Sequence, residues 1–168
     1  AWLATAKGAV EFRASAAGVD ATFGDAVSAQ APPAALAVVA PASLSAALTA
    51  SPSTATAGQP VTVTLTVTNV GEAAALVVTP STPGATGTGS AAFTAGPAPA
   101  AWARLGAGDS AVFGWTFTAR DAGSVVLSAD ASGRDENSDA FVASPPASAT
   151  LSVERPPALE VSVASNDR

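Results

Sequence analysis

The sequence contains no histidine, cysteine, tyrosine or methionine. Without histidine and cysteine, the chain has neither the usual general base nor a thiol nucleophile, and it cannot form a disulfide. A pair of carboxylates is the remaining catalytic option, but most of the 13 Asp and Glu residues fall in predicted turns or on outward-facing strand positions. A catalytic site needs convergent groups in a pocket, so we expect no enzyme activity and no obligatory cofactor.

Positive charge is scarce as well, with 7 Lys and Arg residues against 13 acidic residues and a net charge of −6. Nucleic-acid binding requires clustered positive charge, and we therefore expect no nucleic-acid partner. No apolar run reaches the roughly 18 residues of a membrane helix, because Pro41 interrupts the longest candidate, residues 34–48. An acidic surface with only 12% charged residues is typical of exported proteins, so we predict an extracellular or bacterial cell-surface location.

Strict alternation of apolar and polar side chains is the clearest structural signal in the sequence. In residues 60–69 the apolar side chains Val61, Val63, Leu65 and Val67 alternate with threonines, which indicates a strand with one buried face. Residues 111–118 repeat the pattern with aromatic side chains, and these should form the centre of a core: Phe113, Trp115 and Phe117. Strands at about ten-residue spacing, separated by Gly and Pro turns, predict an all-β, Ig-like antiparallel β-sandwich without helices.

Two polar stretches interrupt this strand pattern. Residues 80–100 are rich in Pro, Gly, Ser and Thr, and we expect a long loop there, with at most one short strand at 91–94. Residues 130–139 are expected to form a second polar loop between the strand at 125–129 and Phe141.

The chain also repeats itself at an offset of 115 residues. Residues 8–50 align without a gap on residues 123–165, with 12 identities in 43 positions, among them Gly18 over Gly133 and Asp20 over Asp135. A fixed period of this kind indicates tandem modules. We therefore predict the C-terminal strands of a preceding repeat in 1–41, a complete domain in 42–154, and the first strand of a following repeat in 155–168.

In this arrangement the two partial repeats carry apolar strand faces that lack their facing strands. Unpaired strands with an uncovered apolar face are marginal alone, so we predict that these residues lie at interfaces. The predicted interface residues are Val10, Phe12, Leu36, Val38, Leu159, Val161 and Val163. Their partners would be neighbouring copies of the repeat, joined either within one chain or head-to-tail between chains.

Several segments of the sequence resemble a known family. The run Ala57-Gly-Gln-Pro60-Val-Thr-Val-Thr-Leu-Thr-Val-Thr-Asn69-Val-Gly71 resembles the opening of the CARDB family, the cell-adhesion-related domain found in bacteria, and its Ig-like relatives. Residues 105–110, 113–117 and 121–123 resemble the second half of that family. The resemblance covers residues 44–153, and it implies a sandwich of about seven strands in large, repetitive, exported bacterial proteins.

Two local features admit a ligand. Calcium prefers six to eight oxygen ligands, and its candidate ligands here are Asp130, Asp135, Glu136 and Asp139, although a solvated polar loop explains the same residues. Trp102 borders the 80–100 segment and is the one tryptophan expected to be exposed for ligand contact, whereas Trp115 and Trp2 are expected in a core.

Two functional hypotheses remain open from the sequence. The first is a structural module of a cell-surface stalk or extracellular fibre, built by end-to-end stacking of Ig-like domains and open to strand complementation between subunits. The second is an adhesive module that recognises a glycan or a protein through the 80–100 loop.

Overall fold

The computed structural model describes residues 6–163, and in this range every regular element is a β-strand. The chain divides between Ala40 and Pro41 into two compact units. Among the described residues no helix is long and apolar enough to span a membrane.

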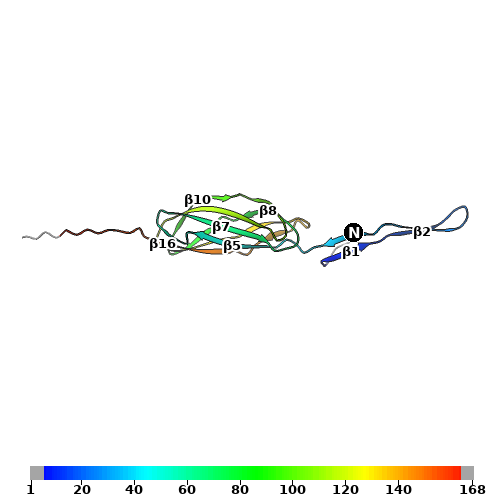
Figure 1. The fold of residues 1–168 in the computed structure, drawn as a ribbon, viewed down its shortest axis with the longest axis horizontal. Helices are drawn as coiled ribbons and strands as arrows, with labels where there is room; N and C mark the ends of the chain where they lie inside the picture. The colour runs from blue at the N-terminus through cyan, green and yellow to red at the C-terminus, as the bar shows by residue number, and fades with distance from the viewer. Residues whose placement is uncertain (1–5, 164–168) are drawn as a thin grey trace, which may run out of the picture. The chain divides into compact units, whose positions relative to one another are not determined.

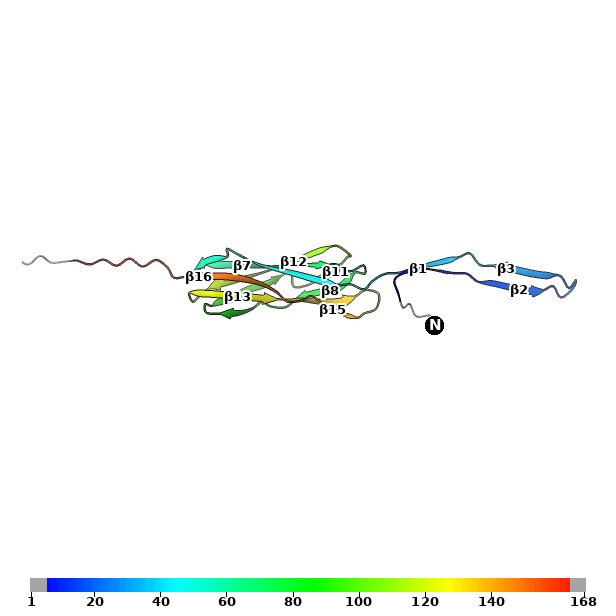
Figure 2. The same cartoon turned by 90° about the horizontal axis from the view of Figure 1, so that it is seen from below.

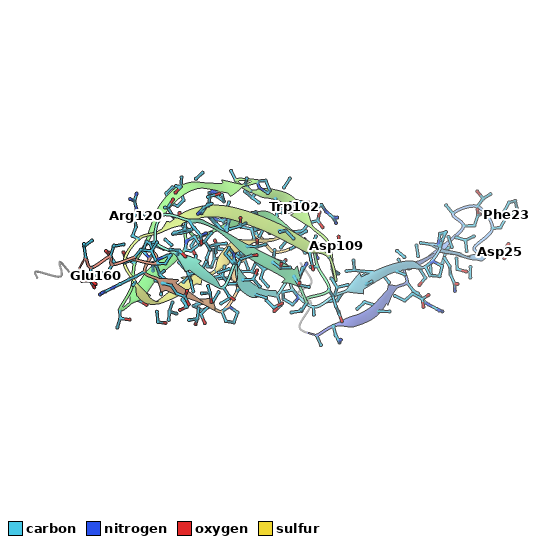
Figure 3. All side chains as sticks on the ribbon, turned by 60° about the vertical axis from the view of Figure 1, so that its left-hand side comes forward. Phe23, Asp25, Trp102, Asp109, Arg120 and Glu160 are labelled. Carbon is cyan, nitrogen blue, oxygen red and sulfur yellow. The ribbon has the colours of Figure 1, made fainter. Side chains whose placement is uncertain are left out.

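The N-terminal unit is one long, interrupted antiparallel hairpin. Its strands are β1 (Gly8–Phe12), β2 (Ser15–Val19), β3 (Ala26–Gln30) and β4 (Ala34–Val38). β1 pairs with β4, and β2 pairs with β3. The turn between β2 and β3 carries Phe23 and Asp25 at its tip (Figure 3).

The second unit is a two-layer sandwich (Figure 1). The first layer has the order β10-β12-β7-β5. Its strands are β5 (Leu44–Ser51), β7 (Pro60–Asn69), β10 (Ala91–Ala98) and β12 (Ser110–Ala119). This order corresponds to strands D, E, B and A of an immunoglobulin sandwich.

The second layer consists of two ladders, β11-β8-β14-β15 and β9-β13-β16-β6, which lie opposite β7 and β12 (Figure 2). Consecutive strands continue from one ladder into the other: β8 into β9, β13 into β14, and β15 into β16. The bounds are β6 (Thr54–Thr56), β8 (Ala75–Pro80), β9 (Gly84–Gly87), β11 (Trp102–Leu105), β13 (Gly123–Ala129), β14 (Ala131–Asp135), β15 (Phe141–Ala143) and β16 (Ala147–Glu154). The predicted all-β, Ig-like sandwich is therefore confirmed.

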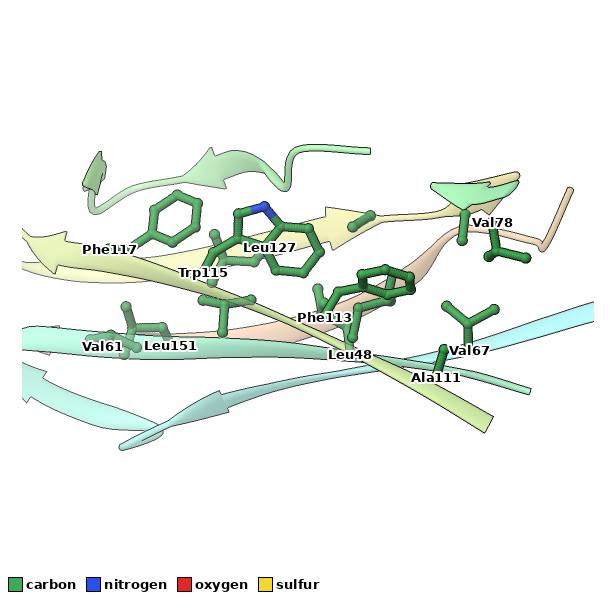
Figure 4. Packing of buried hydrophobic residues seen from close by; sticks show 14 of the residues in the cluster. Leu48, Val61, Val67, Val78, Ala111, Phe113, Trp115, Phe117, Leu127 and Leu151 are labelled. Atoms are coloured by element: carbon green, nitrogen blue, oxygen red, sulfur yellow. The ribbon is translucent and has the colours of Figure 1, made fainter. Parts of the chain in front are cut away.

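The core is built from the side chains that the alternation in the sequence predicts to be buried. β7 pairs with β12 so that Leu65 faces Phe113 and Val63 faces Trp115, and all four side chains are buried. Figure 4 shows these aromatic rings between the layers, together with Leu127 and Leu151 of the second layer. Trp115 buries its indole Nε1 without a hydrogen-bond partner among the described residues.

Two expectations about loops are wrong. Residues 80–100 contain β9 and the eight-residue β10, so they belong to both layers and are not a single loop. β10 pairs with β12 through register shifts between Phe93 and Ala95 and between Ala95 and Ala98, and an irregular edge strand of this kind has no sequence alternation to reveal it. The expected polar loop 130–139 begins as a strand, β14, whose residues Ala131, Gly133 and Asp135 are buried.

Candidate interface and ligand-contact residues

Asp135 ends β14 and ties the entry of the sandwich to the turn before β15. Its Oδ2 accepts the backbone N–H of Ala42 at 2.7 Å, and its Oδ1 accepts the N–H groups of Asn137 and Ser138 at 3.0 and 2.8 Å. Only 2% of Asp135 is exposed. The Ala42 N–H is the main reason that the pKa of Asp135 lies below its ordinary value of 3.8, and the donors at 137 and 138 add to it against the opposing effect of burial.

Asn69 holds the same entry segment, residues 41–43, from the other layer. Its Oδ1 accepts the N–H of Ser43 at 3.2 Å and that of Gly71 at 3.0 Å, while Nδ2 donates to the carbonyl oxygens of Ala73 and Leu105. Gly71 lies so close that a Cβ there would stand 2.3 Å from the carbonyl oxygen of Pro41. The entry segment is therefore fixed by buried polar contacts from β7, from the turn after it and from β14. Sequence reasoning missed this feature.

The four calcium candidates do not share a site. Both carboxylate oxygens of Asp135 already accept hydrogen bonds, and Glu136 binds the guanidinium of Arg104 through two contacts of 2.8 Å. The Arg104 guanidinium lowers the pKa of Glu136. Asp139 pairs instead with Arg134 at 3.4 Å. Among residues 6–163, no group of three or more acidic side chains is placed to hold one ion.

The predicted interface residues of the N-terminal unit lie on one face of the β1–β4 ladder. Val10 is opposite Leu36, Phe12 is opposite Ala34, and Val38 is opposite Gly8. Val10, Phe12 and Leu36 are 41%, 40% and 51% exposed. Burying an aliphatic or aromatic side chain fully is worth about 1.5–3 kcal/mol, so this uncovered face forgoes several such contributions.

The second set of predicted interface residues lies after β16. Leu159, Val161 and Val163 are almost wholly exposed, and residues 155–163 form no strand in the structure. Residues 164–168 of the predicted first strand of a following repeat lie outside the described residues.

Trp102 lies at the start of β11, opposite Val78, and is 40% exposed (Figure 3). Trp115 is buried, as expected, and Trp2 lies outside the described residues. A depression of about 250 Å³ beside β10 is lined by Ala95, Gly96, Ala98 and residues of β7 and β12, with Trp115 as its aromatic residue. Trp102 is not part of that lining.

β6, which follows the first strand β5 along the chain, and the last strand, β16, meet in a parallel pair. β6 runs parallel to β16, with Thr54 opposite Ser152 and Thr56 opposite Glu154. Two further backbone bonds extend the contact at its ends: Ser152 N–H to Ser53 O at 2.8 Å and Ala57 N–H to Glu154 O at 3.0 Å. We call this contact the terminal-strand pair.

Comparison with known proteins gives similarity at the level of the fold. The CARDB domain of a Pyrococcus furiosus protein, solved in complex with di-metal ions, has a TM-score of 0.45 and 13% identity, and the match covers 70% of this chain and 97% of that domain. An ASH/PapD-like domain of human CEP192 also has a TM-score of 0.45, with 10% identity, 68% of this chain and 87% of that chain covered. No protein-family model matches the chain. No curated protein matches it either. A CARDB domain and a PapD-like domain are thus among the solved structures to which this chain is similar.

Proposed function

We propose that this chain is a structural module of an exported bacterial repeat protein, in which Ig-like domains joined end to end form a cell-surface stalk or an extracellular fibre. The observation that carries the proposal is the terminal-strand pair. Because β6 and β16 are parallel and lie near the two ends of the domain sequence, tension applied to those ends acts along the strands. The backbone bonds of the pair are then loaded together and must break together.

The connections between modules support the same role. β16 ends at Glu154, and Leu159 is the counterpart of Leu44, where β5 begins, at the offset of 115 residues. The residues between include Pro156 and Pro157, and the corresponding link before β5 includes Pro41. Short links that contain proline restrict the freedom between modules more than Gly- or Ser-rich tethers do.

Pulling on a single polypeptide tests the proposal. An array of several copies of residues 41–155 is stretched between a surface and a force probe. We expect sudden, equal unfolding steps that each release on the order of 400 Å of chain, because each module holds about 115 residues of at most about 3.5 Å. Gradual extension without steps would contradict a mechanical role.

The alternative is an adhesive module that contacts a glycan or a protein through Trp102. Its support is the exposure of this side chain on an edge strand. The 80–100 segment no longer adds to that support, because it forms β9 and β10. Binding to a glycan array by the chain but not by its Trp102→Ala variant would favour this alternative.

A further inference from the structure

The N-terminal hairpin and the last strands of the sandwich have the same pairing register, residue for residue. Val10 pairs with Leu36 as Val125 pairs with Leu151, and each number differs by 115. In the other half of the hairpin, Gly18 pairs with Val27 as Gly133 pairs with Val142. The two segments are therefore equivalent in backbone pairing as well as in sequence.

Their surroundings differ. Val125, Leu127 and Leu151 are fully buried under β7 and β12, whereas their counterparts Val10, Phe12 and Leu36 are exposed. The sandwich therefore shows how these positions of the repeat are packed when facing strands cover them.

Gly18 indicates one strand that would cover the N-terminal hairpin, the counterpart of β8. At its counterpart Gly133, a Cβ would lie 2.8 Å from the Leu76 carbonyl oxygen and 3.3 Å from Val78 Cγ2, because β8 bulges against β14. Glycine is required there by close approach. At Gly18 the nearest atom to a Cβ is 3.7 Å away, in Val27, so nothing among residues 6–40 requires glycine there. A shallow groove lined by residues 16–18 and 27–29 lies at this place.

Asp20 indicates a second covering segment, the counterpart of the entry segment at residues 41–43. Its Oδ1 accepts the N–H groups of Thr22 and Phe23 at 2.8 and 2.9 Å, which reproduces the turn made by Asp135 Oδ1. In Asp135 the other oxygen, Oδ2, accepts the N–H of the entry segment at Ala42. Asp20 Oδ2 has no such donor among residues 6–163.

We infer that the β1–β4 face, Gly18 and Asp20 form one docking surface for a polypeptide segment of the same repeat type as residues 41–115. The strands of that segment that correspond to β7 and to residues 110–115 of β12 cover Val10, Phe12 and Leu36. Its counterpart of β8 lies beside β2, with a backbone carbonyl against Gly18. Its entry segment donates an N–H to Asp20 Oδ2. A generic apolar partner would fill the face, but it would use neither the glycine nor the carboxylate.

This inference rests on the repeat that also underlies the proposed function, but it makes no use of tension. An array that unfolds without force steps would contradict the stalk and leave this docking surface intact. A hairpin that stays uncovered would contradict the docking surface and leave the mechanics of residues 41–155 intact.

The test adds the proposed covering segment to the chain itself. Residues 41–115 are joined directly ahead of residue 1 of the full chain, which places residue 1 in the register of residue 116, and urea unfolding is followed by circular dichroism. We expect a second cooperative transition besides that of residues 41–154. Gly18→Val should abolish the new transition while leaving the parent chain unchanged. Gly133→Val is the matched control, and it should destabilise residues 41–154 in both chains.

Two outcomes overturn the inference. The first is the absence of a second transition both in the extended chain and in its Phe12→Leu version, which restores the leucine found at Leu127. The second is a hairpin transition in the parent chain that rises with protein concentration, because a second copy would then be the cover. In every preparation that retains Gly133, the unchanged transition of residues 41–154 reports that the protein is folded.

Discussion

Asp135 and Ala42 are 93 positions apart in sequence and are joined by a buried hydrogen bond of 2.7 Å between a carboxylate oxygen and a backbone N–H. The bond attaches the start of the sandwich to the end of β14. Charge-assisted bonds of this kind are among the stronger ones in proteins. This bond is one of the contacts that hold the entry of the module, and the effect of removing it can be measured.

Asp135→Asn should destabilise residues 41–154 by about 1.5–3 kcal/mol at neutral pH, because the amide places N–H hydrogens where the carboxylate accepts them. Unfolding in urea measures the change. An unaltered midpoint would show that the Ala42 contact contributes nothing.

The same residue makes stability depend on pH. The pKa of Asp135 is lower in the folded protein than its ordinary value of 3.8, so its contribution is present above that value and is lost as the pH falls through the folded pKa. Between pH 5 and pH 2, on the order of the window in which a carboxylate protonates, wild type should lose more stability than Asp135→Asn. Equal losses in the two proteins would contradict the assignment.

Gly71→Ala should destabilise the sandwich, because its Cβ would meet the Pro41 carbonyl oxygen at 2.3 Å and displace the entry segment. Gly84→Ala is the control, since a Cβ at that position meets nothing within 4 Å. We expect a loss of about 1–3 kcal/mol for the first variant and little change for the second, measured by thermal unfolding. If the two variants melt together, the close packing at Gly71 is not a constraint.

Ala57→Pro removes the N–H that bonds to Glu154 O in the terminal-strand pair. In pulling experiments this variant should unfold at lower force than wild type. Ala57→Gly keeps the N–H, and its unfolding force should stay closer to that of wild type. Equal forces for the proline and glycine variants would place the mechanical resistance elsewhere in the fold.

Millimolar calcium should leave the melting temperature of the chain unchanged. Asp135 and Glu136 have their carboxylate oxygens occupied by N–H donors and by Arg104, respectively. A rise in melting temperature that disappears in the double variant Asp130→Asn, Asp139→Asn would contradict this expectation.

Sequence reasoning succeeded where one local pattern determines a strand. The alternation of Val61 to Val67 and of Phe113 to Phe117 predicts both central strands of the first layer, because β7 and β12 each have one buried and one more open face. The short strand allowed at 91–94 is the first half of β10. β9 and the rest of β10 escaped prediction because an edge strand with glycines, prolines or register shifts has no such period.

The sequence did not predict the contacts of the entry segment, and the reason is different. Asn69 and Asp135 are polar residues in turn-like sequence, and their burial depends on partners 26 and 93 positions away. The repeat offered one usable signal, since Gly18 and Asp20 recur as Gly133 and Asp135. The chemical reason for that recurrence is visible only in the folded sandwich.

The central claim is that residues 8–38 are the uncovered counterpart of residues 123–153. Amide hydrogen exchange tests it most directly, by comparing residues 34–38 with 149–153 in the chain alone and in the chain extended by residues 41–115. We predict fast exchange at 34–38 in the chain alone, slow exchange at 149–153 in both, and slow exchange at 34–38 once the segment is present. Exchange at 34–38 that stays fast in the extended chain, while 149–153 remains protected, would contradict the account.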